Sequence, residues 1–210
     1  MFNIECIIYL LIIIYSIFYQ FKVIILYNKN KKVVLNDASG LFVAKDILNK
    51  NGLGTLYVTK INGKYNDHYD IERNVIRLSE EVYQESNLAS MVIGIYQSIN
   101  ALCFNDRKKS KEMKMKNTII DYSNKISFIL FILGISSKAL DVMTLCLLIM
   151  IINIVAKYII MNKKIEKFNE NIKYIKKEYK IKQDNLNKIE NNIKALFYNE
   201  LSLHILNNKY

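Results

Sequence analysis

Residues 6–27 read CIIYLLIIIYSIFYQFKVIILY, and this apolar run predicts that the protein is anchored in a membrane. Its only clearly polar members are Ser16, Gln20 and Lys22. About 20 consecutive apolar residues cross the hydrocarbon core of a bilayer as a helix. A cleaved signal peptide is the alternative, but the start MFNIE has no Lys or Arg, and no A-x-A cleavage pattern follows. We therefore expect an uncleaved transmembrane anchor over residues 1–27.

Two further apolar stretches lie close together in the second half of the chain. Residues 126–137 read ISFILFILGISS, and residues 142–161 read VMTLCLLIMIINIVAKYIIM. Only a short turn separates them, so we expect a transmembrane hairpin over residues 126–161. The first arm is short for a bilayer, and a re-entrant or tilted segment is the alternative for it.

Basic residues flank the apolar stretches and orient the chain. Cytoplasmic loops carry an excess of Lys and Arg close to the spans. Here these residues follow the first stretch and lie on both sides of the hairpin, whereas its turn holds Lys138 alone: Lys29, Lys31, Lys32, Arg107, Lys108, Lys109, Lys111, Lys114, Lys116, Lys125, Lys163, Lys164 and Lys167. This predicts a multi-pass protein of the cell membrane, with its N-terminus outside and residues 28–125 and 162–210 in the cytoplasm.

The net charge of +11 is also compatible with nucleic-acid binding. The charges flank membrane segments, however, the Lys residues of the tail alternate with Glu, and no nucleic-acid-binding module is recognisable. We therefore expect the bilayer, and no nucleic acid, as a partner. Cys6, Cys103 and Cys146 form no CxxC pair, so neither a disulfide framework nor a cysteine metal site is expected.

The segment over residues 28–125 has the pattern of a small α+β domain. A helix is expected over residues 41–51 after Ser39, and strands over residues 55–61 and 74–78. Ser79 is placed to cap the short segment EEVY. A helix over residues 87–104 repeats apolar residues at a spacing of three to four, which predicts one buried face.

Three short motifs in this segment are those of a known family. They are ILNKNGL at 47–53, NDHYD at 66–70 and VIRLSEEVY at 75–83. The chain resembles the membrane-anchored neutral zinc metallopeptidases of bacteria, whose signature reads DHYD…VRLSEDVY, although Ile71 stands where that family has Pro. The resemblance implies a small zincin-like helix/strand domain with about three transmembrane helices and a long C-terminal helix.

The same resemblance implies that the catalytic motif has been lost. The HExxH motif of the family, in which two His bind zinc and the Glu acts on water, falls on Tyr96-Gln97-Ser98-Ile99-Asn100. The third ligand of the family, a Glu before the sequence FN, falls on Lys167, next to Glu166. We therefore expect that the zinc site is lost, that no cofactor is bound, and that no residue is catalytic.

The chain has two histidines, His68 and His204. A rearranged zinc site made from both and a carboxylate such as Glu166 is the alternative to a lost one. Asp67, His68 and Asp70 are candidate pocket residues, because they lie in the segment that best matches the family. Their alternative role is structural, with the DHYD segment forming a hairpin connection and its side chains capping backbone N–H groups.

The tail over residues 162–210 repeats apolar residues at heptad spacing, which Lys182 and Glu200 interrupt. This pattern predicts either a helix that folds back on the domain or a coiled coil with a partner or a second copy. The Asn-rich segment at 184–187 is where a break in the helix is expected.

Three functions compete on this sequence. The first is an inactive pseudopeptidase that acts as a binding or scaffold subunit for a membrane protein partner. The second is an active membrane zinc peptidase with a rearranged metal site. The third is a membrane-anchored protein that forms homo-oligomers through its coiled-coil tail.

Overall fold

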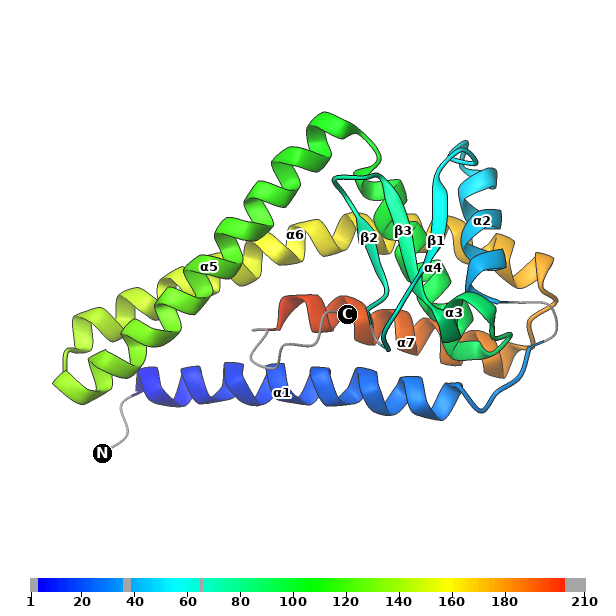
Figure 1. The fold of residues 1–210 in the computed structure, drawn as a ribbon. Helices are drawn as coiled ribbons and strands as arrows, with labels where there is room; N and C mark the ends of the chain where they lie inside the picture. Colours follow the sequence, from blue (N-terminus) through cyan, green and yellow to red (C-terminus); the bar gives the residue numbers. More distant parts are fainter. Residues whose placement is uncertain (1–3, 36–38, 65, 203–210) are drawn as a thin grey trace.

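The computed structural model describes residues 4–35, 39–64 and 66–202, with the side chains of all of these except 107–110. Within them, three helices are long and apolar enough to cross a membrane: α1 (Ile4–Asn30), α5 (Arg107–Ser137) and α6 (Leu140–Glu178). Figure 1 shows α5 and α6 as a hairpin whose tip lies near the start of α1, with the rest of the fold at the other end. The short arm expected at 126–137 is thus the end of a continuous helix that is long enough to span.

Polar contacts join the two arms of the hairpin, and an aromatic contact joins the hairpin to α1. The Asn153 amide of α6 donates to Ser123 Oγ over 2.6 Å and to Asn124 Oδ1 over 2.7 Å, both in α5. Nearer the tip, Tyr9 of α1 stacks on Phe131 of α5, with ring centroids 3.9 Å apart. The hydrophobic effect does not drive helices together within lipid, so close packing and polar contacts such as these fix the pairing.

A three-stranded sheet forms the β part of the fold. Its strands are β1 (Tyr57–Ile61), β2 (His68–Asp70) and β3 (Val75–Ser79), in the order β1-β3-β2. β1 runs parallel to β3, and β2 runs antiparallel to it. The expectation that the DHYD segment is only a hairpin connection is therefore wrong in part, because three of its residues pair with β3 as a strand.

Helices α2 (Gly40–Lys50) and α4 (Leu88–Phe104) form the core with this sheet. Ser39 caps α2 through Phe42 N, and Asn87 caps α4 through Ser90 N. Every residue of α4 from Leu88 to Ile99 is buried, so the prediction of a single buried face was too narrow. The helix is covered on all sides because α1, α2, α6 and α7 contact it in addition to the sheet.

Close backbone approach sets the distance between α2 and α4. A Cβ atom at Gly94 would lie 2.5 Å from the carbonyl oxygen of Gly40, and one at Gly40 would lie 2.5 Å from the carbonyl oxygen of Val82. Only residues without a side chain fit at these two positions. The short helix α3 (Glu80–Gln84) follows β3 directly. Ser79 stands before α3 but does not cap it with its side chain, contrary to expectation.

The tail folds back on the chain itself. α6 continues to Glu178, where the Tyr174 and Tyr179 hydroxyls donate to the Asp46 carboxylate of α2. The break follows at residues 179–182, with Lys180 at a φ of 45°, so the expected position at 184–187 was wrong. α7 (Gln183–Leu201) then packs along α1, α4 and α6, as Figure 1 shows. These helices cover its apolar seam of Leu186, Ile189, Ile193 and Leu196.

Candidate functional site

The segment on which the resemblance places the family's zinc motif lies on α4, inside the fold. Tyr96, the first residue of Tyr96-Gln97-Ser98-Ile99-Asn100, is 3 % exposed. Its hydroxyl donates a hydrogen bond to Oε1 of Glu200, which α7 brings to this point. Burial, and next the negative charge of Glu200, raise the pKa of Tyr96 well above its usual value. The phenol is therefore a fixed hydrogen-bond donor at neutral pH.

Lys164 of α6 completes this contact from a third helix. Its Nζ lies 2.7 Å from Oε1 and 2.6 Å from Oε2 of Glu200, and the residue is only 6 % exposed. The ammonium also lies 5.3 Å from the centroid of the Phe104 ring and 6.0 Å from that of Tyr96. Removing one partner of such a buried pair leaves an uncompensated charge, which is strongly destabilising. Tyr96, Lys164 and Glu200 are called the three-helix cluster below.

The other two residues at the motif position bind neighbouring polar groups. The Gln97 amide donates to the carbonyl oxygen of Asp67 over 3.0 Å, and the Asn100 amide donates to Gln97 Oε1 over 3.2 Å. Gln97 thus connects α4 to the segment that leads into β2. Oδ1 of Asn100 is buried and accepts no hydrogen bond within the part of the chain that the structure describes.

Lys167, on which the resemblance places the third ligand, pairs with a surface residue instead of reaching Tyr96. Its ammonium lies 2.7 Å from the Glu170 carboxylate, and that contact raises the pKa of Lys167. Both side chains are exposed to solvent. Lys164, one helical turn earlier, is the lysine that reaches the motif position. Sequence reasoning missed the pairing of Lys164 with Glu200, although Glu200 stands out as a charge within the apolar seam of the tail.

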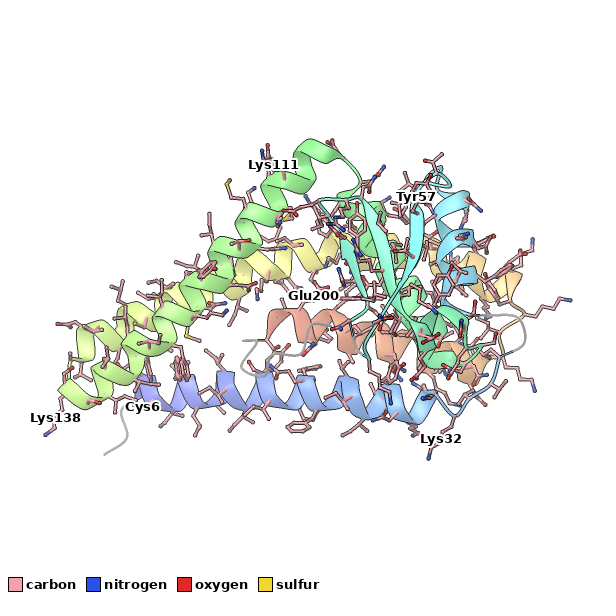
Figure 2. The ribbon with its side chains drawn as sticks, viewed as in Figure 1. Cys6, Lys32, Tyr57, Lys111, Lys138 and Glu200 are labelled. Atoms are coloured by element: carbon pink, nitrogen blue, oxygen red, sulfur yellow. The ribbon has the colours of Figure 1, made fainter. Side chains whose placement is uncertain are left out.

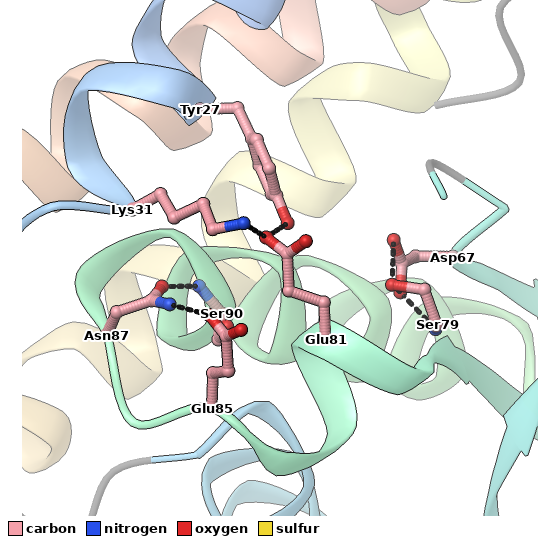
Figure 3. Close-up of polar contacts among 8 residues, drawn as sticks. All are labelled: Tyr27, Lys31, Asp67, Ser79, Glu81, Glu85, Asn87 and Ser90. Atoms are coloured by element: carbon pink, nitrogen blue, oxygen red, sulfur yellow. Dashed lines mark hydrogen bonds and ion pairs between the residues drawn. The ribbon is translucent and has the colours of Figure 1, made fainter. Parts of the chain in front are cut away.

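The signature residues Asp67 and Asp70 hold the sheet and its turn. Asp67 is 2 % exposed, and its carboxylate accepts from Ser79 N over 2.7 Å and from Ser79 Oγ over 3.0 Å, as Figure 3 shows. Burial raises the pKa of Asp67, although the bonds from Ser79 oppose the shift. Asp70 accepts from the backbone N–H groups of Glu72 and Arg73 and pairs with Arg77 at 3.2 Å.

His68 lies between these two aspartates but does not join them. Its side chain is exposed, and its Nδ1 lies 2.6 Å from the carbonyl oxygen of Asn66. The structure therefore does not gather Asp67, His68 and Asp70 into one group. Their side chains contact Ser79, the backbone of the turn and Arg77, which are structural contacts of the kind expected for capping.

The signature also contacts the membrane anchor. In Figure 3, Glu81 of α3 reaches the end of α1, where it accepts from the Tyr27 hydroxyl over 2.8 Å and pairs with Lys31 at 2.9 Å. Partial burial favours the neutral carboxyl, but the hydrogen bonds from Lys31 and Tyr27 outweigh it and lower the pKa of Glu81. The segment that best matches the family thus joins the domain to its first membrane helix.

The donors at the motif position do not fit a zinc ion. Zinc takes Cys, His and carboxylate ligands, whereas this position offers a phenol, two amides and the ammonium of Lys164. Glu200 is the nearby carboxylate, and it is already bonded to Tyr96 and Lys164. Among residues 4–35, 39–64 and 66–202, no three His, Cys, Asp or Glu side chains lie close enough to share a metal ion. His204 lies outside the described residues.

Comparison with known sequences gives the class of the protein. The sequence pattern of the family described as "Putative neutral zinc metallopeptidase" matches residues 5–198, and the chain belongs to this family. Among curated proteins, it is 28 % identical over 132 residues to the "Putative membrane protease YugP" of Bacillus subtilis (strain 168). That match covers 62 % of this chain and 59 % of the relative. No solved structure matches the chain significantly.

Proposed function

We propose that this protein is a membrane pseudopeptidase, which keeps the scaffold of its family and acts as a binding or scaffold subunit. The observation that carries the proposal is the three-helix cluster at the motif position. There, an ammonium and a carboxylate of the chain itself bond one another and the phenol of Tyr96.

The chemistry of the cluster supports this reading in two respects. A cation near the motif position would meet the positive charge of Lys164, and displacing that lysine would break a buried ion pair. The residue at the position of the general base is Gln97, an amide, which cannot take a proton from water at neutral pH. The position therefore has neither an available ligand set nor a base.

The retained signature supports the scaffold part of the proposal. Asp67 and Glu81 hold the sheet and the anchor helix through contacts that need no metal. Selection on folding would keep such residues after catalysis was lost. We further propose, from the flanking lysines, that the N-terminus faces outward and that the domain is cytoplasmic.

Zinc content tests the proposal directly. The full-length protein, purified in detergent, is incubated with zinc, dialysed against a mild chelator and measured by elemental analysis, with its Tm recorded with and without zinc. The proposal expects zinc far below one ion per chain and an unchanged Tm. One zinc per chain together with a raised Tm would overturn it, because a ligand that binds only the native state stabilises it.

Two variants show whether any bound zinc depends on His68 or on the motif position. His68→Ala removes the histidine that lies within the described residues, and it should leave the zinc content as low as in the unmodified protein. A fourfold variant, Tyr96→His, Gln97→Glu, Asn100→His and Lys164→Glu, introduces the HExxH residues and replaces the lysine that reaches this position with a carboxylate. If it folds, as circular dichroism would show, a gain of zinc would verify that the assay detects binding at this position.

A further inference from the structure

One face of α1 is apolar and exposed along nearly the whole helix. Its large exposed side chains run from Ile4 to Ile25 and include Leu10, Leu11, Ile14, Phe18 and Phe21. The polar residues Ser16, Gln20 and Asn30 are buried on the opposite face. The N-terminal part of this outward face is therefore available to lipid, while the inward face contacts the domain.

A group of aromatic residues and one lysine surrounds the point where α7 meets α1. The Tyr15 hydroxyl donates to the carbonyl oxygen of Tyr198 over 3.5 Å, and the rings of Tyr19 and Tyr198 lie 5.3 Å apart. Lys22 Nζ lies 5.2 Å from the ring of Tyr19 and 5.6 Å from that of Phe18. Tyr15, Phe18, Tyr19, Lys22 and Tyr198 are called the aromatic belt below.

Helices α1 and α7 run in opposite directions, but on both of them polar or charged residues lie on the domain side of the belt tyrosines. In Figure 1, α7 passes from its start near the end of α1 towards the N-terminal half of α1. The exposed face of α7 carries Asp184, Asn187, Asn191 and Lys194, and it becomes aromatic at Tyr198. On α1, Lys22 likewise lies on the domain side of Tyr19. Tyrosine at the membrane–water interface with lysine on the aqueous side is the usual arrangement at a bilayer surface.

Helix α6 gives a second and independent indication of where the edge of the hydrocarbon core lies. Its exposed apolar side chains run from Leu140 to Ile159, a length that crosses about 30 Å of hydrocarbon. Lys164 follows a little more than one turn later, beyond the apolar run. It bonds Glu200, which lies two residues after Tyr198. The end of the apolar run of α6 and the aromatic belt therefore lie at the same depth relative to the bilayer. The three-helix cluster lies at this depth too.

We propose that the aromatic belt is a bilayer-contact surface that lies in the headgroup layer and holds the three-helix cluster at the membrane surface. The occupant is the phospholipid interface, where phenol groups meet ester and phosphate oxygens and Lys22 meets phosphate. The belt is continuous with the apolar face of α1, so no gap separates it from the lipid-covered surface. This proposal does not depend on whether the protein binds zinc.

The chain contains no tryptophan, so single tryptophans report local depth without background. Tyr198→Trp probes the belt, and Leu148→Trp, 52 % exposed on α6, probes the membrane interior. Tyr57→Trp, 73 % exposed on β1, is the aqueous control, and Figure 2 places Tyr57 on the side of the domain away from α1. Each full-length variant is reconstituted in vesicles of phosphatidylcholine and phosphatidylglycerol with chains brominated either near the headgroup or near the chain end.

The expected pattern separates the three depths. The Tyr198→Trp fluorescence should be quenched several-fold more by the shallow bromine than by the deep one, the Leu148→Trp fluorescence more by the deep bromine, and the Tyr57→Trp fluorescence by neither. The proposal would be overturned if the fluorescence of Tyr198→Trp were quenched as weakly as that of Tyr57→Trp. That result would mean that water or a second copy of the chain covers the belt. Preferential quenching by the deep bromine would overturn it as well. If Tyr198→Trp does not fold, Phe18→Trp, 56 % exposed in the same belt, decides by the same criteria.

Discussion

The Glu81 carboxylate of α3 accepts a hydrogen bond of 2.8 Å from the Tyr27 hydroxyl of α1. The same carboxylate pairs with Lys31 at 2.9 Å. Glu81 belongs to the signature that the chain shares with its family, and Tyr27 belongs to the membrane anchor. A residue of the signature thus holds the domain against the membrane anchor. This contact needs no catalytic metal.

Removing this carboxylate should destabilise the protein. We expect Glu81→Ala to lower the free energy of unfolding by about 1–2 kcal/mol, because Tyr27, which is buried, and Lys31 both lose their contact with this carboxylate. Glu80→Ala is the matched control, since Glu80 pairs with Lys60 at the surface, and its cost should stay below about 0.5 kcal/mol. Thermal unfolding in detergent, followed by circular dichroism, measures both. Equal effects of the two changes would contradict the role given to Glu81.

The same residue predicts a pH dependence. The pKa of Glu81 is lowered in the folded protein, so its stabilising contribution is present above the unfolded pKa and is lost as the pH falls through the folded value. The advantage in Tm of the unmodified protein over Glu81→Gln should therefore be full at neutral pH and shrink below about pH 4.3, the ordinary pKa of glutamate. A difference that grows on acidification would show that the sign is wrong.

Asp67 should be among the polar residues that are costly to replace. Its buried carboxylate accepts from Ser79 N and Ser79 Oγ, so Asp67→Ala leaves both donors unsatisfied and should cost about 2–3 kcal/mol. His68→Ala, in the adjacent position with an exposed side chain, should cost less than about 0.5 kcal/mol. Urea unfolding of both variants under one detergent condition provides the comparison. A larger loss for the histidine variant would instead support a functional centre at His68.

Close packing at Gly94 gives a fourth test. A methyl group there meets the backbone of Gly40, which has no side chain to move aside, so Gly94→Ala should destabilise by about 1–3 kcal/mol. At Gly54, a methyl group would meet the flexible end of the Asn49 side chain, and Gly54→Ala should cost less than about 1 kcal/mol. Thermal unfolding ranks the two variants. If Gly54→Ala proved the more damaging, the close approach of α2 and α4 would not hold.

Local patterns predicted much of the fold. The apolar runs at 6–27, 126–137 and 142–161 predicted the three long apolar helices, and Ser39 predicted the start of α2. The break of the tail helix was misplaced, because the Asn-rich segment that suggested it is stabilised as helix by packing on α1 and α6. Local propensity is routinely overridden in this way by tertiary contacts.

The candidate site was less accessible from the sequence. The expected HExxH position at Tyr96 followed from the resemblance of the preceding VIRLSEEVY motif to the family. The hydrogen-bond partner of Tyr96, however, comes from Glu200 in α7, and the ion pair from Lys164 in α6. Contacts between residues so far apart in the chain depend on how the tail returns to the domain. A charged residue within an apolar seam was the available signal, and it indicated a buried partner without naming it.

Helix α6 runs without interruption for 39 residues from the hairpin turn to Glu178, a length of about 58 Å. Such a rod acts as a lever with one arm in lipid and the other in the domain. Its lipid arm tilts when the bilayer thins or thickens, because tilting is how a helix matches its apolar length to the surrounding hydrocarbon. Its other arm carries Lys164 and the tyrosines that bind Asp46. We therefore expect a change in membrane thickness to alter the orientation of the domain.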